Sequence, residues 1–104
     1  MSELLSKALR TELPKIGEQE WNNNPTVYTV FQFPSSGWKW FVTEGDAYED
    51  DICFFGYVVG LEREWGYFCL SELESVDLNG IKVVRDEEHV PRTLSECLQQ
   101  YGLA

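Results

Sequence analysis

Four segments rich in aromatic and β-branched residues follow one another closely in the middle of the chain. They are TVYTVFQF (26–33), WKWFVT (38–43), ICFFGYVVG (52–60) and WGYFCL (65–70). Residues of these types favour strands, and short connections between successive strands require antiparallel neighbours. The pattern therefore predicts a four-stranded meander. Segment 52–60 is apolar on both faces, which is typical of a central strand that is covered on both sides.

Helical patterns flank these strands. Apolar residues at helical spacing predict three helices, over residues 3–12, 71–76 and 94–101. The second and third begin at capping boxes, which pair Ser71 with Glu74 and Thr93 with Glu96. A short strand, IKVV (81–84), lies between them. We therefore expect one α+β domain over residues 1–104. Its antiparallel sheet has four to five strands, with N-terminal, short middle and C-terminal helices packed on one face or end.

The chain is strongly acidic, with a formal net charge of -10. This balance argues against direct binding to nucleic acid or to an anionic membrane, and it favours a basic protein partner. Residues 44–77 hold ten carboxylates and a single basic residue, Arg63. The candidate partner-binding residues in the loops of this segment are Glu44, Asp46, Glu49, Asp50, Asp51, Glu62 and Glu64.

Two interpretations of these acidic loops are open. Carboxylates two residues apart on an extended chain are about 7 Å apart, which is of the order of the phosphate spacing along one DNA strand. The loops could thus mimic DNA and occupy a nucleic-acid-binding protein, or they could only keep the protein soluble. Segment 44–51, EGDAYEDD, lacks the spacing of a calcium-binding loop.

Aromatic residues form the second candidate site. Of the 15 aromatic residues, 14 lie between Trp21 and Phe68. On the predicted strands, Trp38 and Trp40 share one face, and Trp65 and Tyr67 share another. Core packing explains most of this enrichment. Both faces of strands 38–43 and 65–70 are aromatic, however, so a half-exposed patch that stacks a small ligand or peptide is the open alternative.

Cysteine usage indicates reduced thiols. Cys53, Cys69 and Cys97 are odd in number, form no CxxC pair and follow no secretory signal. We expect all three to be buried small apolar residues in a cytoplasmic protein.

Catalytic and cofactor motifs are weak. The single histidine, His89, lies in RDEEHVP (85–91), where Asp86 or Glu88 could join it in acid–base chemistry, but an exposed structural loop is the better explanation. The chain has no phosphate-binding glycine loop, nucleophile elbow or metal-ligand spacing. No apolar run reaches the length of about 18–20 residues that a membrane span needs. A non-enzymatic protein without a cofactor is therefore predicted.

The segments VYTVFQF, WKWFVTE, FFGYVVG and WGYFCLSELESV together resemble a bacterial domain-of-unknown-function family, number twenty-nine fifty-eight. The resemblance extends from the first helix to about Arg85. It implies a small cytoplasmic protein that often travels on plasmids and integrative elements, and it supplies no catalytic residue.

Composition and resemblance together predict an interaction protein. Its acidic loops would engage a basic, nucleic-acid-binding partner, as a mobile-element accessory or DNA-mimic inhibitor. The alternative is a ligand- or peptide-binding module that uses the aromatic residues. An exposed edge strand or aromatic face could also form a homodimer.

Overall fold

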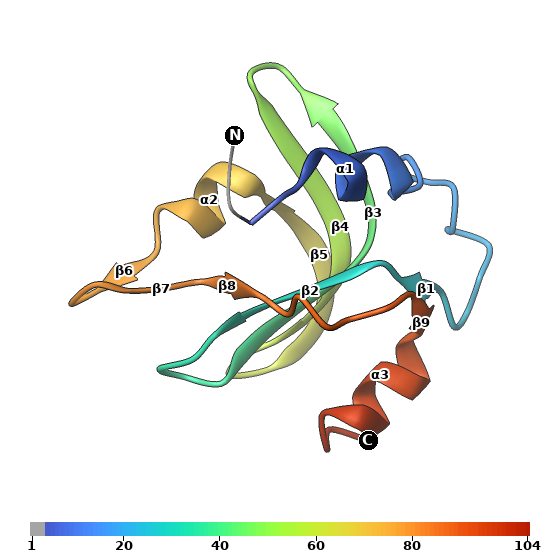
Figure 1. Cartoon of the computed structure of the whole chain (residues 1–104). Helices are drawn as coiled ribbons and strands as arrows, with labels where there is room; N and C mark the ends of the chain where they lie inside the picture. Colours follow the sequence, from blue (N-terminus) through green and yellow to red (C-terminus); the bar gives the residue numbers. More distant parts are fainter. Residues whose placement is uncertain (1–3) are drawn as a thin grey trace.

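The computed structural model describes residues 4–104, and its centre is a five-stranded antiparallel sheet with the strand order β5-β4-β3-β2-β8 (Figure 1). The strands are β2 (Thr29–Phe33), β3 (Trp38–Tyr48), β4 (Asp51–Val59), β5 (Arg63–Cys69) and β8 (Val84–Arg85). The first four are consecutive in the chain and form the predicted meander. The fifth, β8, returns to pair with β2. The predicted α+β class is confirmed.

Two small strand pairs and three helices complete the fold. The strand pairs are β1 (Thr26–Val27) with β9 (Arg92–Thr93), and β6 (Asp77–Leu78) with β7 (Ile81–Lys82). The helices are α1 (Lys7–Glu12), α2 (Leu70–Glu74) and α3 (Leu94–Gln100). The β6–β7 hairpin turns at Asn79-Gly80, where both φ angles are positive, as the two-residue turns of hairpins require. Among residues 4–104, no helix is long and apolar enough to cross a membrane.

The sheet has a core on each of its two faces. On face A, Phe31, Val42, Phe54 and Phe68 pack against residues from α1, α2 and their neighbours; these include Leu5, Leu13, Leu73 and Val83. Face B carries Val30, Phe41 and Val59, which pack against Leu94 and Cys97 of α3. The helices therefore cover both faces, and the expectation of one covered face or end is wrong. Both faces need cover because the strand β4 carries apolar side chains on each of them.

The β3–β4 hairpin is longer than predicted. Segment 44–51, expected as a loop, mostly continues the two strands, with Ala47 opposite Ile52 and Tyr48 opposite Asp51. Only Glu49 and Asp50 form the turn, and Glu49 has a φ of 54°. Backbone pairing with the apolar start of β4 thus outweighs the polar composition of the end of β3. In Figure 1 this hairpin projects at the top of the molecule.

Helix starts differ from prediction in two of three cases. The helix α1 begins at Lys7 after Ser6, whose hydroxyl accepts a hydrogen bond from Leu9 N at 3.1 Å. Leu4 and Leu5 precede the helix and are buried in the core. Residue 3, the predicted first residue of this helix, lies outside the described residues. At α3, the predicted capping box of Thr93 and Glu96 is confirmed.

The capping box predicted at the start of α2 is wrong. The helix begins at Leu70 and its capping residue is Cys69 instead of Ser71, with the carboxylate of Glu72 accepting from Cys69 N at 3.0 Å. Ser71 turns instead toward the hairpin, where its hydroxyl donates to the carboxylate of Asp51. The S-x-x-E spacing is present in the sequence, but the Ser71 hydroxyl binds the Asp51 carboxylate instead of capping the helix.

Candidate binding site

Part of face B is left open beside α3. Phe55 of β4 and Tyr67 of β5 lie directly opposite each other there, and Trp65 is two residues along from Tyr67. The Phe55 and Trp65 rings are stacked, with centroids 5.6 Å apart and planes at 11°. The Phe55 and Tyr67 centroids are 4.9 Å apart. Trp65 is 42% exposed and Tyr67 is 70% exposed, so this three-ring cluster faces solvent.

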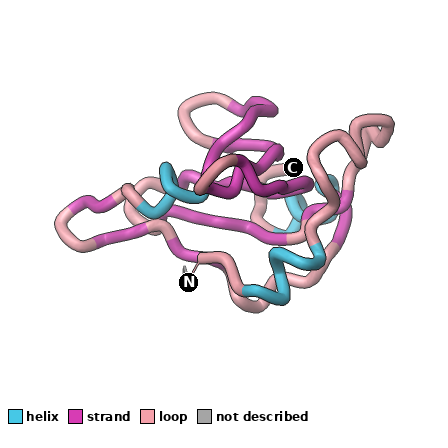
Figure 2. Tube along the Cα trace, turned by 90° about the horizontal axis from the view of Figure 1, so that it is seen from above, coloured by secondary structure: helices cyan, strands magenta, loops and turns pink. Residues whose placement is uncertain are grey.

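The loop between α1 and β1 forms the opposite wall and runs along one side of the molecule (right in Figures 1 and 2). Gln19 fixes it to the sheet. Its side-chain amide donates to Thr26 O at 2.9 Å and to Thr43 O at 2.8 Å, and its carbonyl accepts from Thr26 N at 2.8 Å. This wall is therefore held in place by hydrogen bonds.

A β-bulge in β3 places Thr43 and Glu44 between the aromatic strand and this loop. The register with β4 shifts between Val42 and Glu44, so Thr43 is the extra residue. The Thr43 hydroxyl donates to Phe55 O at 3.1 Å. The Glu44 carboxylate accepts from Gly17 N at 2.8 Å and from Gln19 N at 2.7 Å. The bulge thus joins the aromatic strand to the loop.

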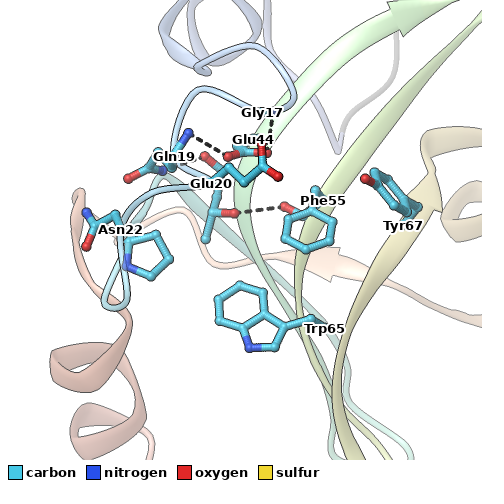
Figure 3. A pocket seen from close by; sticks show the side chains of 10 residues that line it. Gly17, Gln19, Glu20, Asn22, Glu44, Phe55, Trp65 and Tyr67 are labelled. Carbon is cyan, nitrogen blue, oxygen red and sulfur yellow. Dashed lines mark hydrogen bonds between the residues drawn. The ribbon is translucent and has the colours of Figure 1, made fainter.

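Between the two walls lies a cavity of about 300 Å³. The loop contributes Gly17, Gln19, Glu20, Asn22 and Pro25, and the sheet contributes Thr43, Glu44, Phe55, Trp65 and Tyr67. Figure 3 shows the Phe55 and Trp65 rings facing the loop across this space. Among these lining residues, two carry carboxylates and none is basic. Aromatic faces beside carboxylates suit a cationic group.

The predicted aromatic patch is divided between the two faces. Trp65 and Tyr67 come together on face B as described. Trp38 and Trp40 are on face A, where they are half-buried and their ring centroids are 5.9 Å apart. A single patch of all four residues is therefore not formed, because Trp38 and Trp40 align with Phe33 and Phe31 of β2 on the other side of the sheet.

The sequence did not reveal the other members of this site. Phe55 could have been found, because strict alternation along FFGY and across the hairpin to WGYF places it with Trp65 and Tyr67. The loop residues could not, because their position depends on contacts with Glu44, which is 25 to 27 residues away in the chain.

The predicted acidic residues do not form one surface. Asp46, Glu49, Asp50 and Asp51 lie at the tip of the β3–β4 hairpin, whereas Glu62 and Glu64 lie at the other end of β4. The nine residues from Asp51 to Val59 span about 27 Å at the usual rise of a strand. The structure therefore provides two separate acidic groups.

Glu44 belongs to neither group. Its exposed fraction is 3%, and both of its carboxylate oxygens accept backbone hydrogen bonds. As a partner-binding residue it is corrected to a buried structural one, because the bulge directs it inward. The carboxylate of Asp51 also has a structural role. Hydrogen bonds from the Ser71 hydroxyl and the Ile52 amide lower its pKa.

His89 and Asp86 have separate partners. His89 Nε2 is 2.8 Å from Val27 O, and its Nδ1 has no hydrogen-bond partner among the described residues. The Asp86 carboxylate accepts from the Tyr101 hydroxyl and from Glu88 N. Burial, followed by the Asp86 carboxylate, raises the pKa of Tyr101. Within residues 4–104, no group of three or more metal-ligating side chains occurs.

Comparison of the chain with protein-family models, with curated proteins and with solved structures found no match. The resemblance to a bacterial family therefore stays a prediction from the sequence. What the site binds is inferred from its own side chains.

Proposed function

We propose that this protein is a non-enzymatic interaction module that binds a basic, extended segment of a partner protein on face B. The observation that carries this proposal is the exposed cluster of Phe55, Trp65 and Tyr67 beside a cavity with carboxylates in its lining. A lysine or arginine side chain of the partner would lie over the Trp65 or Tyr67 ring, where cation–π attraction contributes about 0.5–2 kcal/mol.

Glu20 supplies the charge of the site. Glu20 is exposed and lines the cavity. The carboxylate oxygens of Glu44, by contrast, already accept hydrogen bonds from the backbone. An exposed carboxylate beside an aromatic face attracts a cation with little desolvation cost. The net charge of -10 adds long-range attraction for a basic partner.

The strand β5 supplies the backbone of the site. It is the outer strand of the sheet on this side and carries both Trp65 and Tyr67. An extended peptide can add to such an edge through main-chain hydrogen bonds, with alternate side chains directed to one face. Every second residue of a bound segment would then meet the aromatic cluster.

The test is the affinity of the protein for a synthetic peptide that alternates arginine or lysine with small residues, measured by calorimetry. We expect Trp65→Ala to weaken binding about tenfold or more, and Glu20→Gln to weaken it less. Trp21→Ala is the matched control, because Trp21 is 79% exposed but lies outside the cavity lining. A peptide with glutamine at each basic position should not bind.

Equal affinity of the wild type and Trp65→Ala would contradict the proposal. So would equal affinity for the basic and the glutamine peptides. Binding should weaken as salt increases, because part of the attraction is between exposed charges.

A second candidate function is supported by the projecting acidic hairpin. Asp46, Glu49 and Asp50 are exposed at its tip, where they could occupy the basic groove of a nucleic-acid-binding protein. Asp50→Lys should abolish capture of such a partner while Trp65→Ala leaves it unchanged. Capture that survives Asp50→Lys would exclude this role. Residence in a bacterial cytoplasm and carriage by a mobile element are proposed on the family resemblance alone.

A further inference from the structure

Two of the three cysteines face each other across neighbouring strands. Cys53 of β4 and Cys69 of β5 are direct partners in the antiparallel register, and their Sγ atoms are 2.6 Å apart. Both residues are half-exposed, so the expectation that all three cysteines are buried is wrong for this pair. Cys97 alone is buried, against the core under α3.

The backbone already has the geometry of a disulfide. Directly opposite residues in antiparallel strands have Cα atoms about 4.5–5.5 Å apart, which lies within the range of about 4.4–6.8 Å that a disulfide needs. The two sulfur atoms would have to approach by only about half an ångström to reach the bonded distance. Rotation of the two side chains supplies this movement, and no strand has to shift.

We propose that Cys53 and Cys69 form a reversible disulfide across face B, made by exchange with a small disulfide and broken by thiols. In the first step, the thiolate of one of the two cysteines attacks one sulfur of the small disulfide, and the thiolate that is released takes up the proton. In the second step, the thiolate of the other cysteine attacks the protein sulfur of this mixed disulfide, and the second released thiolate takes up its proton. The protein loses two electrons and two protons, and the small disulfide gains them.

The surroundings of Cys69 slow the exchange near neutral pH. The Cys53 sulfur, burial and the Glu72 carboxylate together raise the pKa of Cys69 to about 12. The largest of these causes, the contact with the Cys53 sulfur, is the same contact that brings the two sulfur atoms within reach of a bond.

The bond would tie an outer strand to the sheet. In the five-stranded sheet β5 pairs only with β4, and the Phe55–Tyr67 pair lies two residues along both strands from the cysteines on the same face. Oxidation would thus fix the register of the two strands next to the aromatic cluster. Neither the reaction nor its test depends on what that cluster binds.

The experiment is incubation of the folded, reduced wild type with oxidised glutathione, followed by intact mass measurement and peptide mapping. We expect the mass to fall by that of two hydrogen atoms, with one linked peptide pair containing Cys53 and Cys69. Cys97 should remain the single thiol that reacts in denaturant. Dithiothreitol should reverse the change. The oxidised form should melt at least about 5 °C above the reduced form.

Cys97→Ala is the matched control and should lose the same mass, whereas Cys53→Ser and Cys69→Ser should not. Three free thiols in the wild type after incubation would overturn the proposal. A final product with bound glutathione, or a disulfide between two chains, would overturn it equally. The wild-type measurement decides the question even if a serine variant fails to fold.

Discussion

At the scale of single residues, the carboxylates of this chain differ in burial and in the hydrogen bonds that they accept. Those of Glu44 are buried and bind two backbone amides of the loop that forms one wall of the cavity. Those of Glu49 and Asp50 belong to exposed residues at a hairpin tip. Neighbours in an acidic segment can thus have opposite roles, since sequence composition does not show which side chain a bulge turns inward.

Replacement of Glu44 by glutamine tests this structural role. The amide retains one acceptor but presents an N–H group to a backbone N–H group of Gly17 or Gln19, which leaves a buried donor without an acceptor. We expect the free energy of unfolding to fall by about 1–3 kcal/mol in urea denaturation. Glu49→Gln should change it by less than about 0.5 kcal/mol. Equal stability of the two variants would refute the assigned role of Glu44.

The contact between Ser71 and Asp51 predicts a pH dependence. The Ser71 hydroxyl is the largest cause of the lowered pKa of Asp51, whose ordinary value is 3.8. A carboxylate with a lowered folded-state pKa stabilises the fold above its unfolded-state pKa, and this contribution is lost as the pH falls through the folded value.

Ser71→Ala should therefore be less stable than the wild type near neutral pH. The two proteins should become equal in stability once the pH is well below 3.8 and Asp51 is protonated in both. Thermal melts across this range would show the convergence. Ser35→Ala, in an exposed turn, is the control and should differ from the wild type by a constant amount. A constant difference for Ser71→Ala would contradict the contact.

At the scale of elements, the sequence predicted the strands better than their surroundings. The meander could be inferred because segments 26–33, 38–43, 52–60 and 65–70 each carry a strong strand composition. The end of β3 could not, since its polar residues are tolerated only because β4 supplies backbone partners. The start of α2 was also missed, because Asp51 takes the hydroxyl that the local motif assigned to Glu74.

The candidate site was predicted in part for the same reason. Trp65 and Tyr67 share a face by simple alternation, which is a local property of one strand. Whether Trp38 and Trp40 join them depends on the order and register of the strands that lie between them. Those are properties of the whole sheet, and they place the two tryptophans on face A.

The strands β3 and β4 approach closely next to the bulge, which makes Gly56 sensitive to substitution. A Cβ atom at Gly56 would lie 2.0 Å from Phe41 O, a backbone atom that cannot move without disturbing β3. Gly56→Ala should therefore lower the free energy of unfolding by about 1–3 kcal/mol or more. Chemical denaturation would measure the loss.

Gly66 provides the matched control, because it is the direct partner of Gly56 on β5 and no atom lies within 4 Å of its ideal Cβ position. Gly66→Ala should be neutral, or stabilising by up to about 1 kcal/mol. Similar losses for both alanine variants would contradict the close approach of β3 and β4.

At the scale of the whole molecule, charge and aromatic surface are arranged separately. The acidic groups lie at opposite ends of β4, whereas the aromatic cluster lies between them on face B. A basic partner would be attracted by the general field and held at the rings. This arrangement predicts that neutralising the acidic residues beyond either end of β4 alters the salt dependence of binding. Substitutions of the cluster residues Phe55, Trp65 and Tyr67 should alter the affinity itself.

The most direct measurement of the central claim is a titration of the protein with the basic peptide, followed in amide correlation spectra. The account predicts the largest shifts at Phe55, Trp65 with its indole N–H group, Tyr67 and the loop residues Gln19 and Glu20. Residues at the hairpin tip, Glu49 and Asp50, should change little. Shifts confined to the hairpin tip, with the Trp65 indole signal unchanged at saturation, would contradict it.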